Sequence, residues 1–131
     1  MALEDFGGKE ERGELWIEST PKKIEKIIKT LKFLNARLIT ISGVDDQKEL
    51  RVFYHFDLRG KIVNLVVPLL GKKPSIKSIC RIYPNSDLYE RELAEMFNIK
   101  VTGHPDLRPL FLSKDLEGKA PLRKSFKGLK D

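Results

Sequence analysis

Cysteine and histidine are scarce in this sequence, and this limits the metal and redox chemistry of the chain. The 131 residues include one cysteine, Cys80, and two histidines, His55 and His104. An iron–sulfur cluster normally takes about four cysteine ligands, and a zinc finger takes about four cysteine or histidine ligands. We therefore expect no metal site or cofactor in this chain, and we place any redox centre in a partner. Cys80 has the apolar neighbours Ile79 and Ile82 and is predicted to be a buried structural thiol.

Long apolar runs are absent as well. The longest run, from Leu65 to Leu70, is far shorter than the ~20 residues of a membrane-spanning helix. The stretch from Met1 to Glu11 is acidic and lacks the apolar centre of a signal peptide. We therefore expect a soluble, cytosolic chain.

The charge balance is positive, with 25 lysine and arginine residues against 19 aspartate and glutamate residues and a net charge of +6. A solvated lysine-rich surface accounts for this balance, but an acidic partner, a membrane surface or nucleic acid would account for it too. Gln47 is the only glutamine, and this bias toward lysine and glutamate resembles the composition of thermophile proteins.

The length of the chain fits a single domain. Residues 1–13 combine glycine with charged residues and are predicted to be a flexible lead-in. Residues 14–98 carry the periodic apolar patterns of an α+β core. Residues 99–131 lose that periodicity and are predicted to form an extended docking tail.

Alternating apolar and polar residues predict the strands of the core. Arg59-Gly60 fits a two-residue hairpin loop between two of them, because glycine readily takes a positive φ. Gly43 and the pair Asp45-Asp46 indicate a turn before this hairpin. The basic segment 71–78 is predicted to be a loop, and it lacks the glycine spacing of a phosphate-binding loop. The predicted strands are 14–18, 37–42, 50–58 and 61–67.

Two helices are predicted. The first begins with Thr20 as its cap and Pro21 at its first position, and it ends at Asn35. Its apolar face comprises Ile24, Ile27, Ile28, Leu31 and Leu34. The second helix spans 86–97 and ends at Asn98. Its apolar stripe comprises Tyr89, Leu93, Met96 and Phe97, and its charged flank comprises Glu90, Arg91, Glu92 and Glu95.

Within the second helix, Asp87 and Glu90 have the spacing of a capping box, and Arg91 and Glu95 have the spacing of an i,i+4 pair. The fold class predicted from these elements is α+β, with a mostly antiparallel sheet, two packed helices and an extended C-terminal tail. His55 lies on the more polar face of its strand and is predicted to be an ordinary sheet histidine.

Three blocks of sequence in the C-terminal half carry a family resemblance. They are Tyr89 to Ile99, Gly103 to Arg108, and Gly118 to Phe126. In this order they resemble the signature of the 30-kilodalton subunit of respiratory complex I, whose bacterial form is the C subunit of NADH-quinone oxidoreductase. Membrane-bound NiFe hydrogenases and related ferredoxin-linked complexes contain the same domain.

The chain departs from the family pattern at a few positions. Leu88 stands where the family usually has tryptophan, Glu95 replaces aspartate, and Asn98 replaces glycine. The third block reads Gly-Lys-Ala-Pro-Leu-Arg, where the family usually has Gly-His-Pro-Leu-Arg. These changes favour a hydrogenase-type or other divergent branch over the mainstream quinone-reducing branch.

The resemblance implies a non-catalytic subunit on the hydrophilic arm of a membrane-bound redox complex. Its partners would be the large subunit, of the 49-kilodalton or NiFe hydrogenase type, and the iron–sulfur subunits. Iron–sulfur, NiFe or quinone centres would then belong to those partners. The chain would lie at the cytoplasmic side of the cell membrane and reach the membrane only through the complex.

The resemblance also implies which residues dock. The charged flank of the second helix would lie at the interface, although a solvated helix face is the alternative. The segment from Gly103 to Arg108 is interpreted as a docking turn, and the segment from Pro121 to Arg123 as a second anchor or else a mobile end. The predicted docking residues are Glu90, Arg91, Glu92, Glu95, Gly103, His104, Pro105, Asp106, Leu107, Arg108, Pro121, Leu122 and Arg123.

Two alternatives come from the residues themselves. A stand-alone basic domain that binds nucleic acid would explain the net charge and the lysines near Lys72 and Lys119. Such binding needs exposed aromatic residues, and most aromatic residues here fall at predicted core positions. A small enzyme would have to rely on His104 and Asp106, and no recognisable nucleophile accompanies them.

Overall fold

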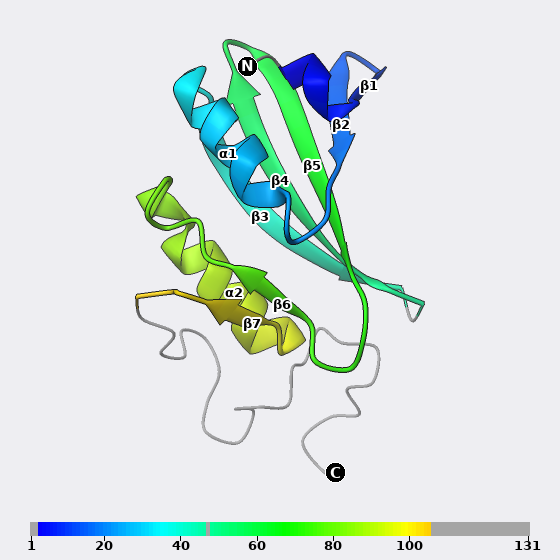
Figure 1. The fold of residues 1–131 in the computed structure, drawn as a ribbon, viewed down its shortest axis with the longest axis vertical. Coiled ribbons are helices and arrows are strands. Elements are labelled where there is room, and N and C mark those ends of the chain that lie inside the picture. Colours follow the sequence, from blue (N-terminus) through cyan, green and yellow to red (C-terminus); the bar gives the residue numbers. More distant parts are fainter. Residues whose placement is uncertain (1–2, 47, 106–131) are drawn as a thin grey trace.

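The computed structural model describes residues 3–46 and 48–105 (Figure 1). Two helices and a central sheet make up most of the fold. In chain order, the elements are η1 (Leu3–Phe6), β1 (Lys9–Glu11), β2 (Glu14–Glu18), α1 (Ile24–Phe33), β3 (Arg37–Asp45), β4 (Leu50–Leu58), β5 (Lys61–Leu69), β6 (Ser75–Lys77), η2 (Pro84–Ser86), α2 (Asp87–Phe97) and β7 (Lys100–Thr102).

The central sheet has five strands in the order β1-β2-β5-β4-β3. β2 pairs with β5 in parallel, and the other neighbours in this sheet are antiparallel. A second, two-stranded sheet pairs β6 with β7 in parallel, and α2 lies in the connection between them. Parallel strands require such a crossover, which is usually a helix. The predicted α+β class with a mostly antiparallel sheet and two helices is therefore confirmed.

Helix α1 has the predicted apolar face but begins later than predicted. Residues 21–23 form a turn, in which the backbone N–H groups of Lys23 and Ile24 both donate to the carbonyl of Thr20 at 3.1 Å. Thr20 therefore precedes a turn and is not the cap residue, which is Lys23. At the other end Asn35 has φ +63°, and this left-handed residue ends the helix region as predicted.

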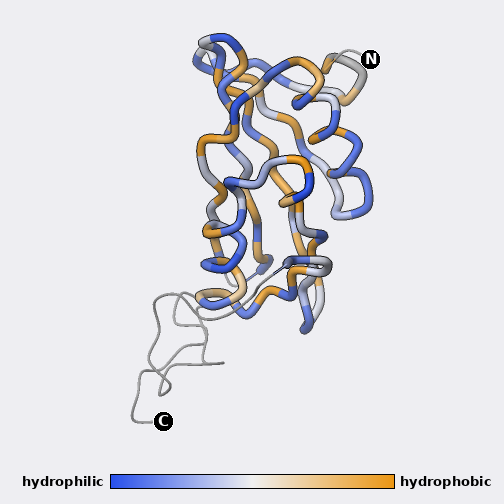
Figure 2. The backbone as a smooth tube through the Cα atoms, turned by 90° about the vertical axis from the view of Figure 1, so that its left-hand side faces the viewer, coloured by the Kyte–Doolittle hydropathy of each residue, from blue (hydrophilic) through white to orange (hydrophobic). Residues whose placement is uncertain are grey.

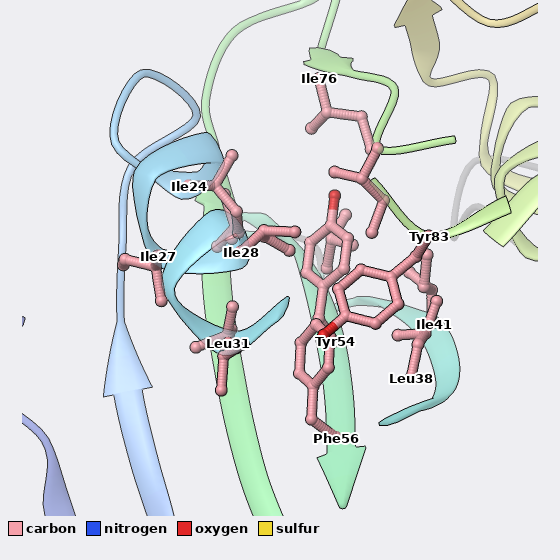
Figure 3. Close-up of a cluster of buried hydrophobic side chains, with 14 of the residues drawn as sticks. Ile24, Ile27, Ile28, Leu31, Leu38, Ile41, Tyr54, Phe56, Ile76 and Tyr83 are labelled. Carbon is pink, nitrogen blue, oxygen red and sulfur yellow. The ribbon is translucent and has the colours of Figure 1, made fainter. Parts of the chain in front are cut away.

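Both helices pack on the same face of the sheet. Tyr54 and Phe56 of β4 are fully buried on that face (Figure 3). The ring centres of Phe56 and Tyr83 lie 5.3 Å apart. The hydroxyl of Tyr83 donates a hydrogen bond to the carbonyl of Ala36 at 2.7 Å. Figure 2 shows apolar and polar residues following one another along the strands, as expected where one face is buried.

The hairpin between β4 and β5 is the one predicted. Arg59 and Gly60 both have positive φ, +53° and +90°, which is the requirement of a type I′ turn. Asp57 accepts a hydrogen bond from the backbone of Gly60 at 2.8 Å. β5 continues beyond the predicted end at 67, as far as Leu69.

The predicted turn before the hairpin forms at Asp46, whose Oδ1 accepts hydrogen bonds from the backbone N–H groups of Lys48 and Glu49. The prediction is wrong for Gly43, because β3 continues through it to Asp45. Gly43 is paired with Val52, and a Cβ atom at Gly43 would lie 2.8 Å from the ring of Phe97. The glycine therefore lets α2 approach the sheet closely and does not break the strand.

Two stretches predicted to be irregular contain regular structure. β6 lies within the predicted loop 71–78, and β7 lies within the predicted tail 99–131. In the predicted lead-in, β1 pairs with β2, and the side chain of Leu3 is buried. Within residues 3–46 and 48–105, no helix is long and apolar enough to cross a membrane.

Candidate docking site around Glu90

Helix α2 buries a carboxylate in its first turns. Glu90 has no exposed surface, and Ser86, Leu93 and Phe97 are buried with it. These four positions follow the i, i+4, i+7, i+11 pattern of one helix face. The buried face is therefore rotated by about one residue from the predicted stripe, and the prediction that Glu90 lies on the charged flank is wrong.

The carboxylate of Glu90 is satisfied by the segment that follows β6. Its Oε1 accepts hydrogen bonds from the hydroxyl of Ser78 at 2.7 Å and from the thiol of Cys80 at 3.1 Å. Its Oε2 accepts a hydrogen bond from the backbone N–H of Ile79 at 2.8 Å. The predicted capping box is not formed, because the carboxylate turns toward this segment. Three donors offset much of the cost of burying a charged group.

Cys80 is half-buried, where the sequence predicts full burial. Its sulfur accepts a hydrogen bond from the hydroxyl of Ser86 at 3.3 Å, besides donating to Glu90. Burial raises the pKa of the Cys80 thiol, and the neighbouring charge of Glu90 acts in the same direction. The thiol is therefore protonated at neutral pH, which does not suit a nucleophile.

The turn after β7 brings a histidine onto the same cluster. Gly103 has φ +77°, and the side chain of His104 has no exposed surface. Its Nε2 lies 3.0 Å from Oδ1 of Asp87, 3.3 Å from the carbonyl oxygen of Asp87 and 3.9 Å from Oε1 of Glu90. The first two family blocks of the sequence therefore meet in space.

Asp87 connects this cluster to the rest of α2. Its Oδ2 lies 3.7 Å from Nη1 of Arg91, whose side chain is 13% exposed. A carboxylate in the first turn of a helix is also favoured by the helix dipole. The geometry therefore holds Arg91 against its own helix.

The outward side of α2 contains the remaining predicted docking residues. Glu92 and Glu95 are half-buried, and the apolar side chain of Leu88 is 56% exposed. These positions share one helix face by their i, i+4, i+7 spacing. Gly103 and Pro105 are exposed in the turn. Asp106, Leu107, Arg108, Pro121, Leu122 and Arg123 lie outside the described residues.

Sequence reasoning misses Ser78, Ile79 and Cys80 as partners of Glu90. The one local signal is that Ser86, Glu90, Leu93 and Phe97 repeat at helical spacing, which marks Glu90 as a candidate for burial. The donors come from a separate segment, and no periodic pattern indicates them.

His55 lies on the opposite face of the sheet. Its Nδ1 is 2.6 Å from Oδ1 of Asn64, and its Nε2 is 3.5 Å from the hydroxyl of Ser42. Asn64 in turn donates to Glu14 at 2.8 Å. The His55 ring stacks on Phe53, with ring centres 6.2 Å apart. These contacts agree with the predicted role as a sheet histidine.

Taken together, these features define an α+β domain in which Glu90 of the first signature block and His104 of the second meet beside α2. The family described as respiratory-chain NADH dehydrogenase, 30 Kd subunit, matches residues 17–131, and the chain belongs to this family.

Two relatives illustrate the range of the family. The chain is 38% identical over 95 residues to the C subunit of F(420)H(2) dehydrogenase from Methanosarcina mazei, covering 70% of this chain and 60% of that protein. It is 33% identical over 122 residues to the C/D subunit of NADH-quinone oxidoreductase from Proteus mirabilis, covering 79% of this chain and 20% of that protein. The chain thus spans about three fifths of the first relative and a fifth of the second.

A solved structure shares the fold over almost the whole chain. It is a chain of the membrane-bound sulfane sulfur reductase, described as an archaeal respiratory membrane complex. The two chains are 25% identical with a TM-score of 0.88, and the match covers 98% of this chain and 82% of the other.

Proposed function

We propose that this chain is a non-catalytic subunit of a complex I-like membrane-bound redox complex, and that it docks against the large catalytic subunit. Membership of the 30 Kd subunit family supports the general role. The matches include an F(420)H(2) dehydrogenase subunit and a sulfane sulfur reductase chain, so the electron donor and acceptor differ among relatives. The substrate chemistry would therefore belong to the partners.

One observation carries the docking proposal. Glu90 of the first family block and His104 of the second lie in a buried cluster, which fixes α2 and the turn at 103–105 relative to each other. Leu88, Glu92 and Glu95 are then presented together on the outward side of a rigid helix. An exposed apolar side chain flanked by carboxylates is suited to a protein interface with an apolar centre and a charged rim.

The large subunit is the proposed partner. The Proteus mirabilis relative carries both letters, C and D, in its name, and the matched region is only a fifth of its length. If this relative joins a C subunit and a D subunit in one polypeptide, a separate C subunit such as this chain would bind a separate D subunit. Iron–sulfur subunits would adjoin it, and the complex would hold the chain at the cytoplasmic side of the membrane.

Affinity purification tests this proposal. The tagged chain would be recovered from gently solubilised membranes of its source, with partners identified by mass spectrometry and nickel assayed. We expect a large subunit in the eluate, with nickel for a membrane hydrogenase and without nickel for a quinone- or sulfur-reducing relative. Recovery of the chain alone, or with nucleic acid released by salt, would overturn the proposal.

A matched pair of variants locates the docking face. Leu88→Asp on α2 should reduce recovery of the large subunit by at least about tenfold, since a buried unpaired charge in an interface costs several kcal/mol. Phe33→Asp on α1 is the control, because Phe33 is 78% exposed and also apolar. Equal losses with both variants would contradict docking centred on α2. Hydrogen exchange over residues 99–126 should slow in the assembled complex.

A further inference from the structure

Three side chains of metal-binding type converge at the Glu90 cluster. One ligand atom from each of Cys80, Glu90 and His104 lies within 4.8 Å of the other two. They come from three segments of the chain, namely the stretch between β6 and η2, helix α2, and the turn after β7. The fold has therefore assembled a ligand set that has no recognisable spacing in the sequence.

The separations suit a small cation in a tetrahedral shell. Ligand atoms about 2.0–2.3 Å from a zinc ion lie roughly 3.3–3.8 Å from one another in that geometry. Here Sγ of Cys80 is 3.1 Å from Oε1 of Glu90, and that oxygen is 3.9 Å from Nε2 of His104. Small side-chain movements would therefore bring these atoms to the separations of a zinc shell.

Asp87 adjoins the histidine of this group. Its Oδ1 is a buried atom that lies 3.0 Å from Nε2 of His104, and the carbonyl oxygen of Asp87 lies 3.3 Å from the same nitrogen. These contacts hold the imidazole ring in place beside Cys80 and Glu90.

The charges around the cluster also favour a cation. The side chains of Glu90 and His104 have no exposed surface, and the groups that donate to Glu90 are a hydroxyl, a thiol and a backbone N–H. A divalent ion would balance one carboxylate and one thiolate inside the protein.

We propose that Cys80, Glu90 and His104 bind a zinc ion, with Asp87 orienting the His104 ring. Thiolate, imidazole and carboxylate together suit zinc, whereas magnesium and calcium prefer oxygen ligands alone. On binding, the thiol of Cys80 loses its proton to water and its sulfur bonds to the ion. The Ser86 hydroxyl, 3.3 Å from that sulfur, and the Ile79 N–H, on the other oxygen of Glu90, would orient two of the ligands.

The bound ion would have a structural role. It would tie the turn at 103–105 to α2 and to the segment after β6, and so fix the point from which the chain continues toward residue 131. This inference does not depend on the docking proposal, because the isolated chain is sufficient to test it.

Cobalt(II) binding to the isolated chain provides a direct test, because Cys80 is its only cysteine. We expect one equivalent of Co²⁺ to produce a thiolate-to-cobalt charge-transfer band with tetrahedral ligand-field absorption, and Zn²⁺ to displace it. Cys80→Ser should abolish the charge-transfer band. His104→Gln should weaken zinc binding by more than about tenfold. Loss of a residue that binds the metal directly costs more affinity than loss of a residue that only orients a ligand, which typically costs at least about tenfold.

His55→Gln is the matched control, since it removes the only other histidine, on the far face of the sheet. It should bind zinc like the unmodified chain, and circular dichroism would establish that each variant is folded. Absence of a charge-transfer band in the unmodified chain would overturn the proposal. So would equal zinc affinity in the unmodified chain and in His104→Gln.

Discussion

Oε1 of Glu90 and Nε2 of His104 lie 3.9 Å apart with both side chains fully buried, although one belongs to α2 and the other to the turn after β7. The contact connects the first family block to the second. It also explains why a glutamate and a histidine with no obvious partners in the sequence belong to a single cluster.

Removal of the Glu90 carboxylate should destabilise the domain strongly. Glu90→Ala would leave the hydroxyl of Ser78 and the N–H of Ile79 without their acceptor, at an expected cost of about 2–4 kcal/mol in the free energy of unfolding. Urea denaturation would measure it. Glu92→Ala, on the outward side of the same helix, should cost less than about 1 kcal/mol. Similar values for the two variants would contradict the buried role of Glu90.

We expect that even a methyl group added at Gly43 lowers the stability of the domain. Gly43→Ala would place its Cβ 2.8 Å from the Phe97 ring, and overpacking of this kind typically costs about 1–3 kcal/mol. The double variant Gly43→Ala with Phe97→Leu should destabilise the domain less than the sum of the two single variants, because the smaller side chain makes room. Thermal unfolding of the four proteins would test the coupling, and strict additivity would count against the contact.

Tyr83 should make stability depend on pH in the alkaline range. Burial raises the pKa of Tyr83 to about 12, so the folded protein retains this proton more tightly than the unfolded chain. Its stabilising contribution is therefore complete below the unfolded pKa of about 10 and is lost as the pH rises toward 12. Tyr83→Phe should cost about 1 kcal/mol at neutral pH by removing the hydrogen bond to Ala36. The difference between the two proteins should shrink in urea titrations from about pH 10 to about pH 12, and a constant difference would contradict the shift.

Asn35 should show the effect of its left-handed conformation. With φ at +63°, Asn35→Ala should lose roughly 1 kcal/mol of stability, because a Cβ without a compensating local hydrogen bond disfavours this region. Asn35→Gly should be neutral or slightly stabilising at the same site. Equal effects of alanine and glycine in chemical denaturation would show that backbone strain is not the cause.

Much of the fold is accessible from the sequence. The long strands are predictable because residues 50–58 and 61–67 alternate with period two and meet at the Arg59-Gly60 turn. The helices are predictable from their spacing, and Asn35 and Asn98 both take the left-handed conformation that ends them. In each of these cases neighbours along the chain determine the structure.

The features that sequence reasoning misses depend on contacts between segments that are far apart in the sequence. β6 and β7 each contain three residues, which is too short for a periodic pattern, and their pairing joins segments far apart in the sequence. A glutamate in a charged stretch of helix is ordinarily solvated. The hydroxyl, thiol and N–H groups of residues 78–80, placed by the tertiary fold, make the burial of Glu90 tolerable.

The pairing of β6 with β7 has a consequence for motion. The N–H of Lys100 donates to the carbonyl of Pro74 at 2.9 Å, and the N–H of Ser78 donates to the carbonyl of Thr102 at 2.8 Å. These two hydrogen bonds thus hold together the two ends of the segment 78–99, which includes α2. We expect a segment closed in this way to exchange its protected amide hydrogens together, in one opening event, as a small cooperative unit within the larger domain.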